Sequence, residues 1–493
     1  MNDSKILARF APLFEPRGIV VAGVSSHPGK FGFVTLHNIL SNGYQGEIYG
    51  TNRDGGEVLG VSLVKTISEL PEEAVIDLVF VCTPASSNEQ LLRDCALRGI
   101  RAAFLTSAGY GEAGDDGKRS EQDLVSLANE LGILIAGPNG QGLVSTPVHL
   151  CAQIVAPYPP SGAIAIASQS GNFVSSFENL SRASGVGVSR AVSAGNAADL
   201  NVSDYLEYFA VDPKTRVSLA YTEGVIDGRE FFERAQAATA KKALVVLKGG
   251  STDSGQRAAQ SHTGALAGDD RVFRGMARQA GIAQAFSVEE AFDASAAFAT
   301  QPLPRGPRVA VLTVVGGWGV VTADAISNSE LVLAKIPPEL EAAINEKLPA
   351  RWSHNNPIDC AGGETRDTIP ELMELIADHS EVDAIIYLGL GVQSNQAKMF
   401  RSGKWADTPD IERIISYHER QDSRFAQSAA EASSRTMKPI LVATELTITD
   451  PDNAGVKAVK DLGQYCFPSG PRAVKALEHL YRYSRYREKI LAP

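Results

Sequence analysis

Residues 18–33 read GIVVAGVSSHPGKFGF, a run of apolar, mostly β-branched residues followed by a turn rich in glycine and serine. The run predicts a buried strand at Gly18–Gly23, and the residues after the turn predict a helix through His37–Leu40. A strand, a small-residue turn and a helix together form the basic unit of a parallel α/β domain. In such domains ligands bind where the strands end, so this turn is the first candidate site.

The same unit recurs along the chain, with SQSGNF (168–173) and VGGWGV (315–320) in the position of the turn. The other predicted strands are Glu47–Tyr49, Leu78–Cys82, Ala102–Thr106, Ile133–Ala136, Ala163–Ala167, Gly187–Val192, Val217–Tyr221, Ala243–Leu247, Val309–Val315, Ala384–Leu388 and Pro439–Ala443. Proline-rich connectors at 157–162 and 301–308 indicate boundaries. We therefore predict three domains, at 1–145, 146–300 and 301–493, the first of them Rossmann-like. The polar segment Arg401–Ser434 is predicted to be an exposed helical excursion.

Composition limits the class of protein. The 493 residues are 44% hydrophobic and 21% charged, with a net charge of −11, as in an ordinary globular protein. No basic stretch could neutralise phosphates, so a nucleic-acid partner is not expected. Five well-separated cysteines have no metal-binding spacing, and we expect reduced thiols and no metal site. The chain has no run of about 18 apolar residues and no convincing signal peptide, so we expect a cytoplasmic protein without a membrane partner.

Two turns could hold an anion at the start of a helix. GVSSHPG (23–29) offers backbone N–H groups, but it is neither GxGxxG nor a Walker A loop. By itself it fits either a phosphate-bearing ligand or a tight structural turn. In SQSGN, Ser170 and the Gly171 amide could hold a phosphoryl group, although an N-cap serine before a tight turn explains the same residues.

His262 lies in KGGSTDSGQRAAQSHTGALAGDD (248–270), a stretch crowded with small residues that let a phosphate or a partner surface approach the ring. An imidazole nitrogen is nucleophilic near neutral pH and can carry phosphate covalently. Glu223, in YTEGVIDGRE, follows a predicted strand and could accept a hydrogen bond from His262. Taken alone, a lone histidine is usually structural and a loop carboxylate is usually solvated.

Taken together, these stretches resemble the NDP-forming acyl-CoA synthetases, which are relatives of succinyl-CoA synthetase. The matching motifs follow the family's order over almost the whole chain: FEPRGIVVAGVSSHPGKFG, DLVFVCTPA, FLTSAGYGE, GPNGQGL, IASQSGNF, YTEG, VLKGG…SHTGALAG, VLTVVGGWGVVTADA and NNPIDCAGG. The resemblance implies an α/β chain with a Rossmann-like CoA-binding domain followed by two flavodoxin-like domains of the succinyl-CoA-synthetase type.

The resemblance also implies roles for individual residues. A nucleotide would phosphorylate His262, a carboxylate would take the phosphate to give an acyl phosphate, and CoA would then form the thioester. Glu223 would stabilise the charged imidazole. The CoA site would comprise Gly23, Ser25, Ser26, Pro28, Thr83, Pro84, Thr106, Ser107, Ala108 and Asn139. The phosphate site would comprise Ser168, Ser170, Gly171, Asn172 and Gly264.

Three features of the sequence qualify the resemblance. Gly140 stands where the family often has cysteine, and Trp318 stands at a position that is usually small. Nothing in the sequence resembles an ATP-grasp domain. We therefore expect an α subunit that works with a separate ATP-grasp β subunit, in an α2β2 or similar assembly, which binds ATP or GTP with Mg²⁺. The small carboxylate or acyl-CoA substrate is left open.

Two other functions fit parts of the sequence. The first is a regulatory protein that binds CoA or acyl-CoA without catalysis, against which the presence of His262 and Glu223 argues. The second is a nicotinamide-dependent oxidoreductase, which needs an acidic ribose ligand about 20 residues past the glycine turn. Glu47 has that spacing but is expected before a strand rather than at its end.

Overall fold

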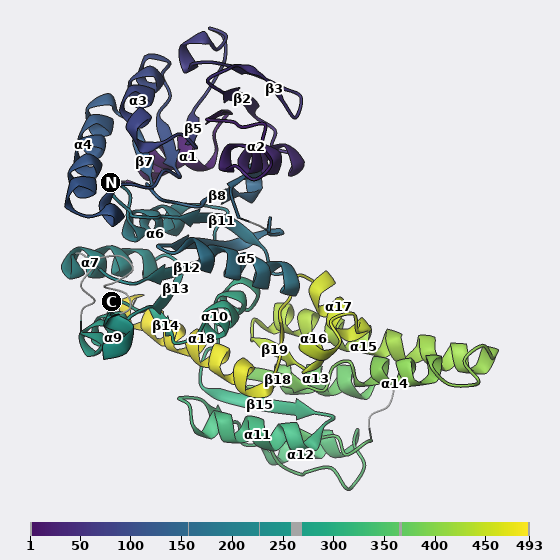
Figure 1. Cartoon of the computed structure of the whole chain (residues 1–493). Helices are drawn as coiled ribbons and strands as arrows, with labels where there is room; N and C mark the ends of the chain where they lie inside the picture. Colours follow the sequence, from purple (N-terminus) through teal and green to yellow (C-terminus); the bar gives the residue numbers. More distant parts are fainter. Residues whose placement is uncertain (1, 156, 226, 258–268, 364–366, 492–493) are drawn as a thin grey trace. The chain divides into compact units, whose positions relative to one another are not determined.

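The computed structural model describes residues 2–155, 157–225, 227–257, 269–363 and 367–491, and within these ranges the chain forms three β-sheets (Figure 1). The contacts divide the chain into two compact units, Met1–Ala183 with Gly187–Val288 and Ser184–Val186 with Glu289–Pro493. The first unit holds two sheets and the second unit holds the third. The division into three domains at 145 and 300 stays a prediction. None of the described helices is long and apolar enough to span a bilayer.

The first sheet has the strand order β3-β4-β2-β1-β5-β6-β7 and is parallel except between β3 and β4. Its strands are β1 (Gly18–Ala22), β2 (Glu47–Thr51), β3 (Gly56–Val58), β4 (Val61–Val64), β5 (Leu78–Val81), β6 (Ala102–Leu105) and β7 (Leu134–Ala136). The predicted parallel strands are confirmed to within two residues. The β3–β4 hairpin was not predicted, because its strands are too short and polar to show alternation.

The helices of the N-terminal part are α1 (Asp3–Phe14), α2 (Phe31–Ser41), α3 (Asn88–Leu97) and α4 (Asp115–Leu131). Helix α1 packs against the second sheet's helix α6 (Val202–Val211) through aromatic rings. Phe10 and Phe14 stack on Tyr208, with ring centroids 4.9 and 5.0 Å apart. The start of the chain therefore joins the first two sheets in one compact unit.

The second sheet has the order β14-β13-β12-β10-β11-β8-β9. Its strands are β8 (Gly142–Ser145), β9 (Leu150–Gln153), β10 (Ser161–Ser168), β11 (Val188–Ser193), β12 (Val217–Thr222), β13 (Ala243–Lys248) and β14 (Ala283–Ala285). Helices α5 (Gly171–Ser184), α6, α7 (Gly228–Thr239) and α9 (Asp270–Gln279) belong to the same part of the chain. The sheet is parallel from β14 to β11, but β8 runs antiparallel to β11 and β9.

The β8–β9 hairpin connects the two parts of the first unit. The Asn38 side-chain amide of α2 donates to the Gln153 carbonyl at the end of β9, at 2.8 Å. The helix that follows the first glycine turn is thereby tied to the edge of the second sheet.

The third sheet is parallel, with the order β16-β15-β18-β19-β20 and β17 paired with β15. Its strands are β15 (Arg308–Thr313), β16 (Val332–Leu333), β17 (Ile358–Asp359), β18 (Ala384–Leu388), β19 (Ile440–Ala443) and β20 (Cys466–Phe467). The helices are α10 (Val288–Thr300), α11 (Gly316–Ser327), α12 (Pro338–Asn345), α13 (Thr368–Asp378), α14 (Val392–Arg401), α15 (Pro409–Thr436), α16 (Leu446–Thr449), α17 (Ala454–Asp461) and α18 (Gly470–Leu491). Alternate strand residues, such as Ile385 and Tyr387, share one core with α12, α13 and α15.

The first and third sheets begin with the same ion pair. The Arg17 backbone N–H and guanidinium both donate to Asp77, at 2.8 and 2.7 Å. Arg308 makes the equivalent contacts with Asp383, at 3.0 and 3.0 Å. In each case the arginine lies at the start of one strand, β1 or β15, and the aspartate directly precedes the neighbouring strand, so the pair fixes two parallel strands at their amino ends.

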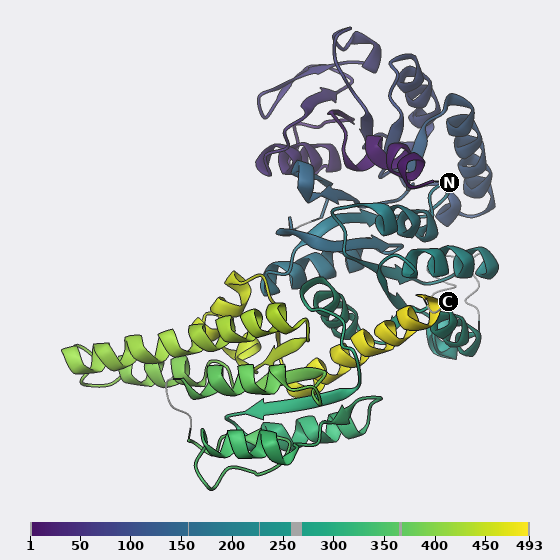
Figure 2. The same ribbon diagram turned by 180° about the vertical axis from the view of Figure 1, so that it is seen from behind.

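Helices α14 and α15 form a hairpin that extends beyond the third sheet in both views (Figures 1 and 2). Most of Arg401–Ser434 is helical, as predicted, but the segment is only partly exposed. Phe425, Ala426 and Ala429 are buried in the core with β18 and β19. The buried stripe of α15 combines alanines with polar Gln421, Asp422 and Ser433, which is why the periodicity looked patchy in the sequence.

Candidate active site

The first turn lies between β1 and α2, as predicted. Gly23 has a φ of +86°, which favours glycine. An ideal Cβ on Gly32, in the first turn of α2, would lie 2.1 Å from the Gly23 carbonyl oxygen, so the helix starts directly on the strand end. No side chain caps α2, and its first turn carries no acidic residue. Its backbone N–H groups are therefore suited to an anion.

The predicted CoA residues of this turn differ in exposure. Ser26 and Pro28 are exposed, and Ser25 is half-buried. The Ser25 hydroxyl accepts a hydrogen bond from the backbone N–H of His27 at 3.0 Å, which closes the turn. Ser26 and Pro28 present the open side of the turn.

The next predicted CoA residues lie at the carboxyl ends of β5 and β6, where the Asn88 side chain hydrogen-bonds two of them. The Asn88 amide donates to the Ser107 hydroxyl at 3.1 Å and accepts from the Thr83 hydroxyl at 3.1 Å. Ser107 in turn donates to the Thr83 carbonyl at 2.7 Å. The Thr106 hydroxyl is directed inward and donates to the Val81 carbonyl at 2.9 Å, whereas Pro84 and Ala108 are exposed. Asn88 was not predicted, because it lies inside a helix and outside every motif.

Asn139 connects the predicted CoA residues of the first sheet to a loop of the second sheet. Its backbone N–H donates to the Ser107 carbonyl at 3.0 Å, and its side-chain amide donates to Asn196 at 3.3 Å. Asn139 has a φ of +58°, and its side chain is exposed. Asn196 is held by Glu121 at 2.8 Å. The GPNG loop therefore joins the ends of β6 and β11.

The predicted phosphate turn lies between β10 and α5. The Ser168 hydroxyl accepts from the Ser170 backbone N–H at 3.1 Å and donates to the Ser170 carbonyl at 2.6 Å. Ser168 thus shapes the turn from a fully buried position, while Asn172 is exposed at the helix start. The backbone N–H groups of Gly171 and Asn172 begin α5, where an anion is favoured.

Glu223 follows β12 and lies next to this turn. It is buried, with 7% of its surface exposed, and it accepts from the Tyr221 hydroxyl at 3.2 Å. Tyr221 stacks on Phe173 of α5, with ring centroids 3.9 Å apart. Burial, together with the neighbouring Glu223 carboxylate, raises the pKa of Tyr221 above its ordinary value. The hydroxyl therefore remains a donor.

Two further residues belong to this corner, the region where the carboxyl ends of β10, β12 and β13 meet. The Gln169 side-chain oxygen accepts from the Glu223 backbone N–H at 2.6 Å and from the Thr222 hydroxyl at 3.2 Å. Lys248 ends β13 opposite Thr222 and donates to the Gly249 carbonyl at 3.1 Å. Burial lowers the pKa of Lys248. Both residues stood inside quoted motifs, but only a structure shows that the three strand ends meet.

His262 and Gly264 lie outside the described residues, so their predicted roles stay predictions. Gly249, which follows β13 and precedes their segment in the sequence, lies against Glu223. An ideal Cβ on Gly249 would be 2.7 Å from the Tyr221 hydroxyl and 3.4 Å from the Glu223 side chain.

Glu47 cannot serve as the ribose ligand of a dinucleotide at the first turn. It is the first residue of β2, at the amino end of the strand, whereas the turn lies at the carboxyl ends. Its carboxylate accepts from the Tyr49 hydroxyl at 2.7 Å and from the Val75 N–H at 3.2 Å. Within the described ranges, no cluster of His, Cys, Asp and Glu side chains could hold a metal ion.

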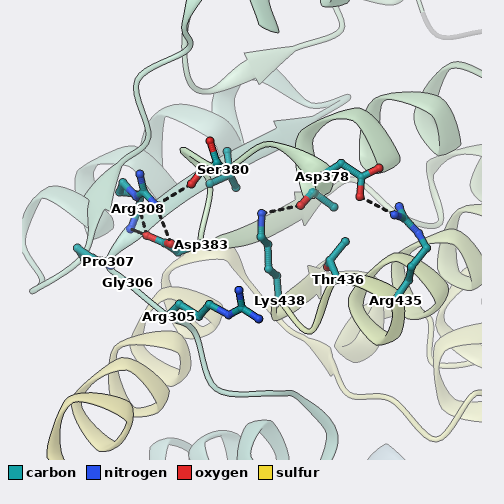
Figure 3. Close-up of a pocket in the computed structure, with 12 residues that line it drawn as sticks. Arg305, Gly306, Pro307, Arg308, Asp378, Ser380, Asp383, Arg435, Thr436 and Lys438 are labelled. Atoms are coloured by element: carbon teal, nitrogen blue, oxygen red, sulfur yellow. Dashed lines mark hydrogen bonds and ion pairs between the residues drawn. The ribbon is translucent and has the colours of Figure 1, made fainter. Parts of the chain in front are cut away.

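A cavity of about 590 Å³ in the second unit is lined by basic side chains (Figure 3). It lies at the amino ends of the third sheet's strands. Lys438 donates to the carbonyls of Ala377 and His379, both at 2.7 Å, where α13 ends, and Arg435 pairs with Asp378. Arg308 pairs with Asp383. These cations neutralise helix ends and carboxylates, so the cavity has a structural explanation.

Three family models match the chain in succession. A CoA binding domain matches residues 17–145, a succinyl-CoA ligase like flavodoxin domain matches 161–298, and a ligase-CoA domain matches 309–392. The α subunit of acetate–CoA ligase [ADP-forming] I from Pyrococcus furiosus is 32% identical over 97% of this chain and 98% of its own length. The chain belongs to the family of ADP-forming acetate–CoA ligase α subunits.

Other members of this ligase family support the assignment. The α subunit of the Pyrococcus furiosus isoenzyme II is 36% identical over 76% of this chain and 80% of its own length. The dinucleotide-forming acetyl-coenzyme A synthetase 1 of Candidatus Korarchaeum cryptofilum, solved with phosphate and ADP, superposes with a TM-score of 0.83. That structure is 30% identical and covers 98% of this chain and 99% of its own. The ligase fold, a CoA-binding domain followed by flavodoxin-like ligase domains, is the one predicted.

Proposed function

We propose that the chain is the CoA-binding, phosphate-carrying subunit of an acyl-CoA ligase that forms a nucleoside diphosphate. The observation that carries the proposal is the corner at which Gln169 ties Glu223 to the Ser168–Asn172 turn. This corner belongs to the same compact unit as the CoA-binding domain. Asn139 links the two through Ser107 on one side and Asn196 on the other.

The reaction runs in three transfers. An imidazole nitrogen of His262 attacks the γ-phosphorus of a nucleoside triphosphate, the bond to the β–γ bridging oxygen breaks, and the nucleoside diphosphate leaves. A carboxylate oxygen then attacks that phosphorus, the N–P bond breaks, and an acyl phosphate forms at the Ser170–Asn172 turn. The CoA sulfur attacks the acyl carbon, the C–O bond to phosphate breaks, and the thiol proton leaves with phosphate or water. Glu223 stabilises the cationic imidazole, and the helix start stabilises the phosphoryl oxygens.

The nucleotide site belongs to a second polypeptide in this proposal. Two relatives that are matched over 98% and 80% of their own length are named α subunits. In Archaeoglobus fulgidus, acetate–CoA ligase [ADP-forming] I is matched over 54% of its length, as expected if a further module is fused there. We propose an ATP-grasp β subunit, with ATP or GTP and Mg²⁺, in an α2β2 or similar assembly.

Family membership leaves the acyl group open. Relatives include a 4-hydroxybutyrate–CoA ligase of Nitrosopumilus maritimus, 29% identical over 76% of this chain, and a trans-feruloyl-CoA synthase, 31% identical over 70%. The acyl groups in these names, 4-hydroxybutyryl and feruloyl, differ from acetyl in size and polarity.

Phosphate labelling tests the proposal. The purified chain, its nucleotide-binding partner and γ-labelled ATP should give acid-labile label on the wild type and none on His262→Ala. Glu223→Gln should reduce the label, and both variants should bind CoA like the wild type in calorimetry. Exposed His37→Ala is the matched histidine control. Equal labelling of His262→Ala, or no CoA binding by any form, would refute the proposal.

A further inference from the structure

Four buried polar atoms lie in and around α5 without a hydrogen-bond partner among the described residues: Gln141 Oε1, Ser175 Oγ, Glu178 Oε1 and the Tyr158 hydroxyl. We call these four side chains the α5 polar cluster. Buried polar groups in proteins nearly always have a partner, and one left without any costs free energy. Four such atoms around one helix indicate that a group outside the described residues satisfies them.

The cluster begins between the CoA residues and the phosphate turn. Gln141 follows Asn139 by two positions, and an ideal Cβ on Gly171 would lie 2.1 Å from its side-chain oxygen. Ser175 follows Gly171 by one helical turn, and Glu178 follows Ser175 by three residues, so the three share one face of α5. The face leads away from the place where the acyl phosphate is proposed to form.

Glu178 lies deepest in the cluster and is completely buried. Its Oε2 accepts from the Gln153 side-chain amide at 3.2 Å. Burial raises the pKa of Glu178 to about 8, so near pH 7 the carboxyl group is mainly protonated. Because Gln153 already donates to Oε2, the proton belongs on Oε1, which has no acceptor among the described residues.

Tyr158 directly follows Pro157, whose carbonyl accepts at 3.3 Å from the same Gln153 amide that donates to Glu178. The cluster therefore offers hydroxyl donors from Ser175, Tyr158 and protonated Glu178, and one amide acceptor from Gln141. An oxygen-bearing group complements this set, whereas a plain hydrocarbon chain does not.

We propose that the α5 polar cluster binds the far end of the acyl group, and that the acid used carries a second oxygen function, a hydroxyl, keto or carboxyl group. The inference rests on the proposed function, because it assumes that the acyl group is transferred at the Ser170–Asn172 turn. Gly171 and Glu178 are separated by about 10 Å along the helix. Side chains lean toward the helix start and shorten that span, so acids of about four to six carbons reach the cluster.

Calorimetry on the full chain separates this inference from the proposed function. Its ligands are CoA, butyryl-CoA, 4-hydroxybutyryl-CoA and succinyl-CoA. We expect at least one of the two oxygenated thioesters to bind about tenfold more tightly than butyryl-CoA, as one or two buried hydrogen bonds provide. Comparison of the hydroxyl with the carboxyl thioester identifies which oxygen function is recognised.

Variants then assign the preference to the cluster. Glu178→Leu and, independently, Gln141→Leu should bring the affinity ratio close to one while CoA itself binds unchanged. Ser176→Ala is the control, because the Ser176 hydroxyl donates to the Asn172 carbonyl on the exposed side of the same helix. Circular dichroism confirms folding, and two separate variants keep the test decisive if one does not fold.

Three results would overturn the inference: equal binding of all three thioesters, a ratio that survives both leucine variants, or a cluster filled by water alone in a crystal structure with bound acyl-CoA. Failure to bind CoA in any form would count against the proposed function instead.

Discussion

The side chain of Gln169 accepts a hydrogen bond from the backbone N–H of Glu223, at 2.6 Å. The two residues are 54 positions apart, but they follow β10 and β12, which are paired in register at Ser168 and Tyr221. One amide oxygen therefore fixes the distance between the phosphate turn and the carboxylate proposed to stabilise the imidazole.

Replacing Gln169 should slow phosphate transfer without affecting CoA. Gln169→Leu leaves the buried Glu223 N–H without an acceptor, which costs about 1–3 kcal/mol. If the same free energy is lost from transition-state stabilisation because the Glu223 carboxylate is misplaced, labelling of His262 should slow by about 10- to 100-fold. Rapid-quench labelling measures the rate and calorimetry measures CoA affinity. Gln90→Leu, at an exposed helical position, is the control, and equal rates in both variants would contradict the prediction.

Tyr221→Phe should have a smaller effect at the same corner. The variant keeps the ring stacked on Phe173 but removes the hydroxyl that donates to Glu223 at 3.2 Å. Loss of one hydrogen bond corresponds to about 0.5–1.5 kcal/mol, or roughly two- to tenfold in the labelling rate. The labelling rate should therefore decrease by about two- to tenfold. The melting temperature should change by no more than a few degrees. A variant that labels like the wild type would show that the hydroxyl does not position Glu223.

The sequence predicted the longer parallel strands because each is an apolar run that ends in a small-residue turn, as in GIVVAG. It did not predict the short parallel strands β4, β14, β16, β17 and β20, which have two to four residues. It could not predict the β8–β9 hairpin, whose strands are short and lie at a sheet edge. The candidate residues of the two turns were found by motif, since both turns lie at helix starts. Gln169 and Asn88 were missed because their roles depend on which strands become neighbours, and local spacing carries no information about that.

Glu178 should make the folded state less stable as the pH rises. Burial raises its folded-state pKa to about 8 from an ordinary 4.5. Between these values the folded state binds more protons than the unfolded state, so stability declines with increasing pH, by at most about 1.4 kcal/mol per pH unit. The stability that the neutral Glu178 side chain contributes is fully present below about pH 4.5 and is lost by about pH 8. Denaturant unfolding of Glu178→Gln should lack this slope, and an unchanged slope would place the ionisation elsewhere.

Replacement of Arg190 should strongly destabilise the first unit. The Arg190 guanidinium is completely buried in β11, where it donates to Asp212 at 3.1 Å, to Glu15 at 2.5 Å and to the Ser145 hydroxyl. Arg190→Met leaves the buried Asp212 carboxylate without its cation, and removal of one partner of a buried pair costs about 3–5 kcal/mol.

The double variant Arg190→Met/Asp212→Leu should recover part of that loss, because it removes the stranded charge as well as its partner. Exposed Arg229→Met, which breaks only a surface pair with Glu233, should cost less than about 1 kcal/mol. Free energies of unfolding from urea titrations measure all three variants. If Arg190→Met proved no more costly than Arg229→Met, the buried guanidinium would not be a main source of stability in the first unit.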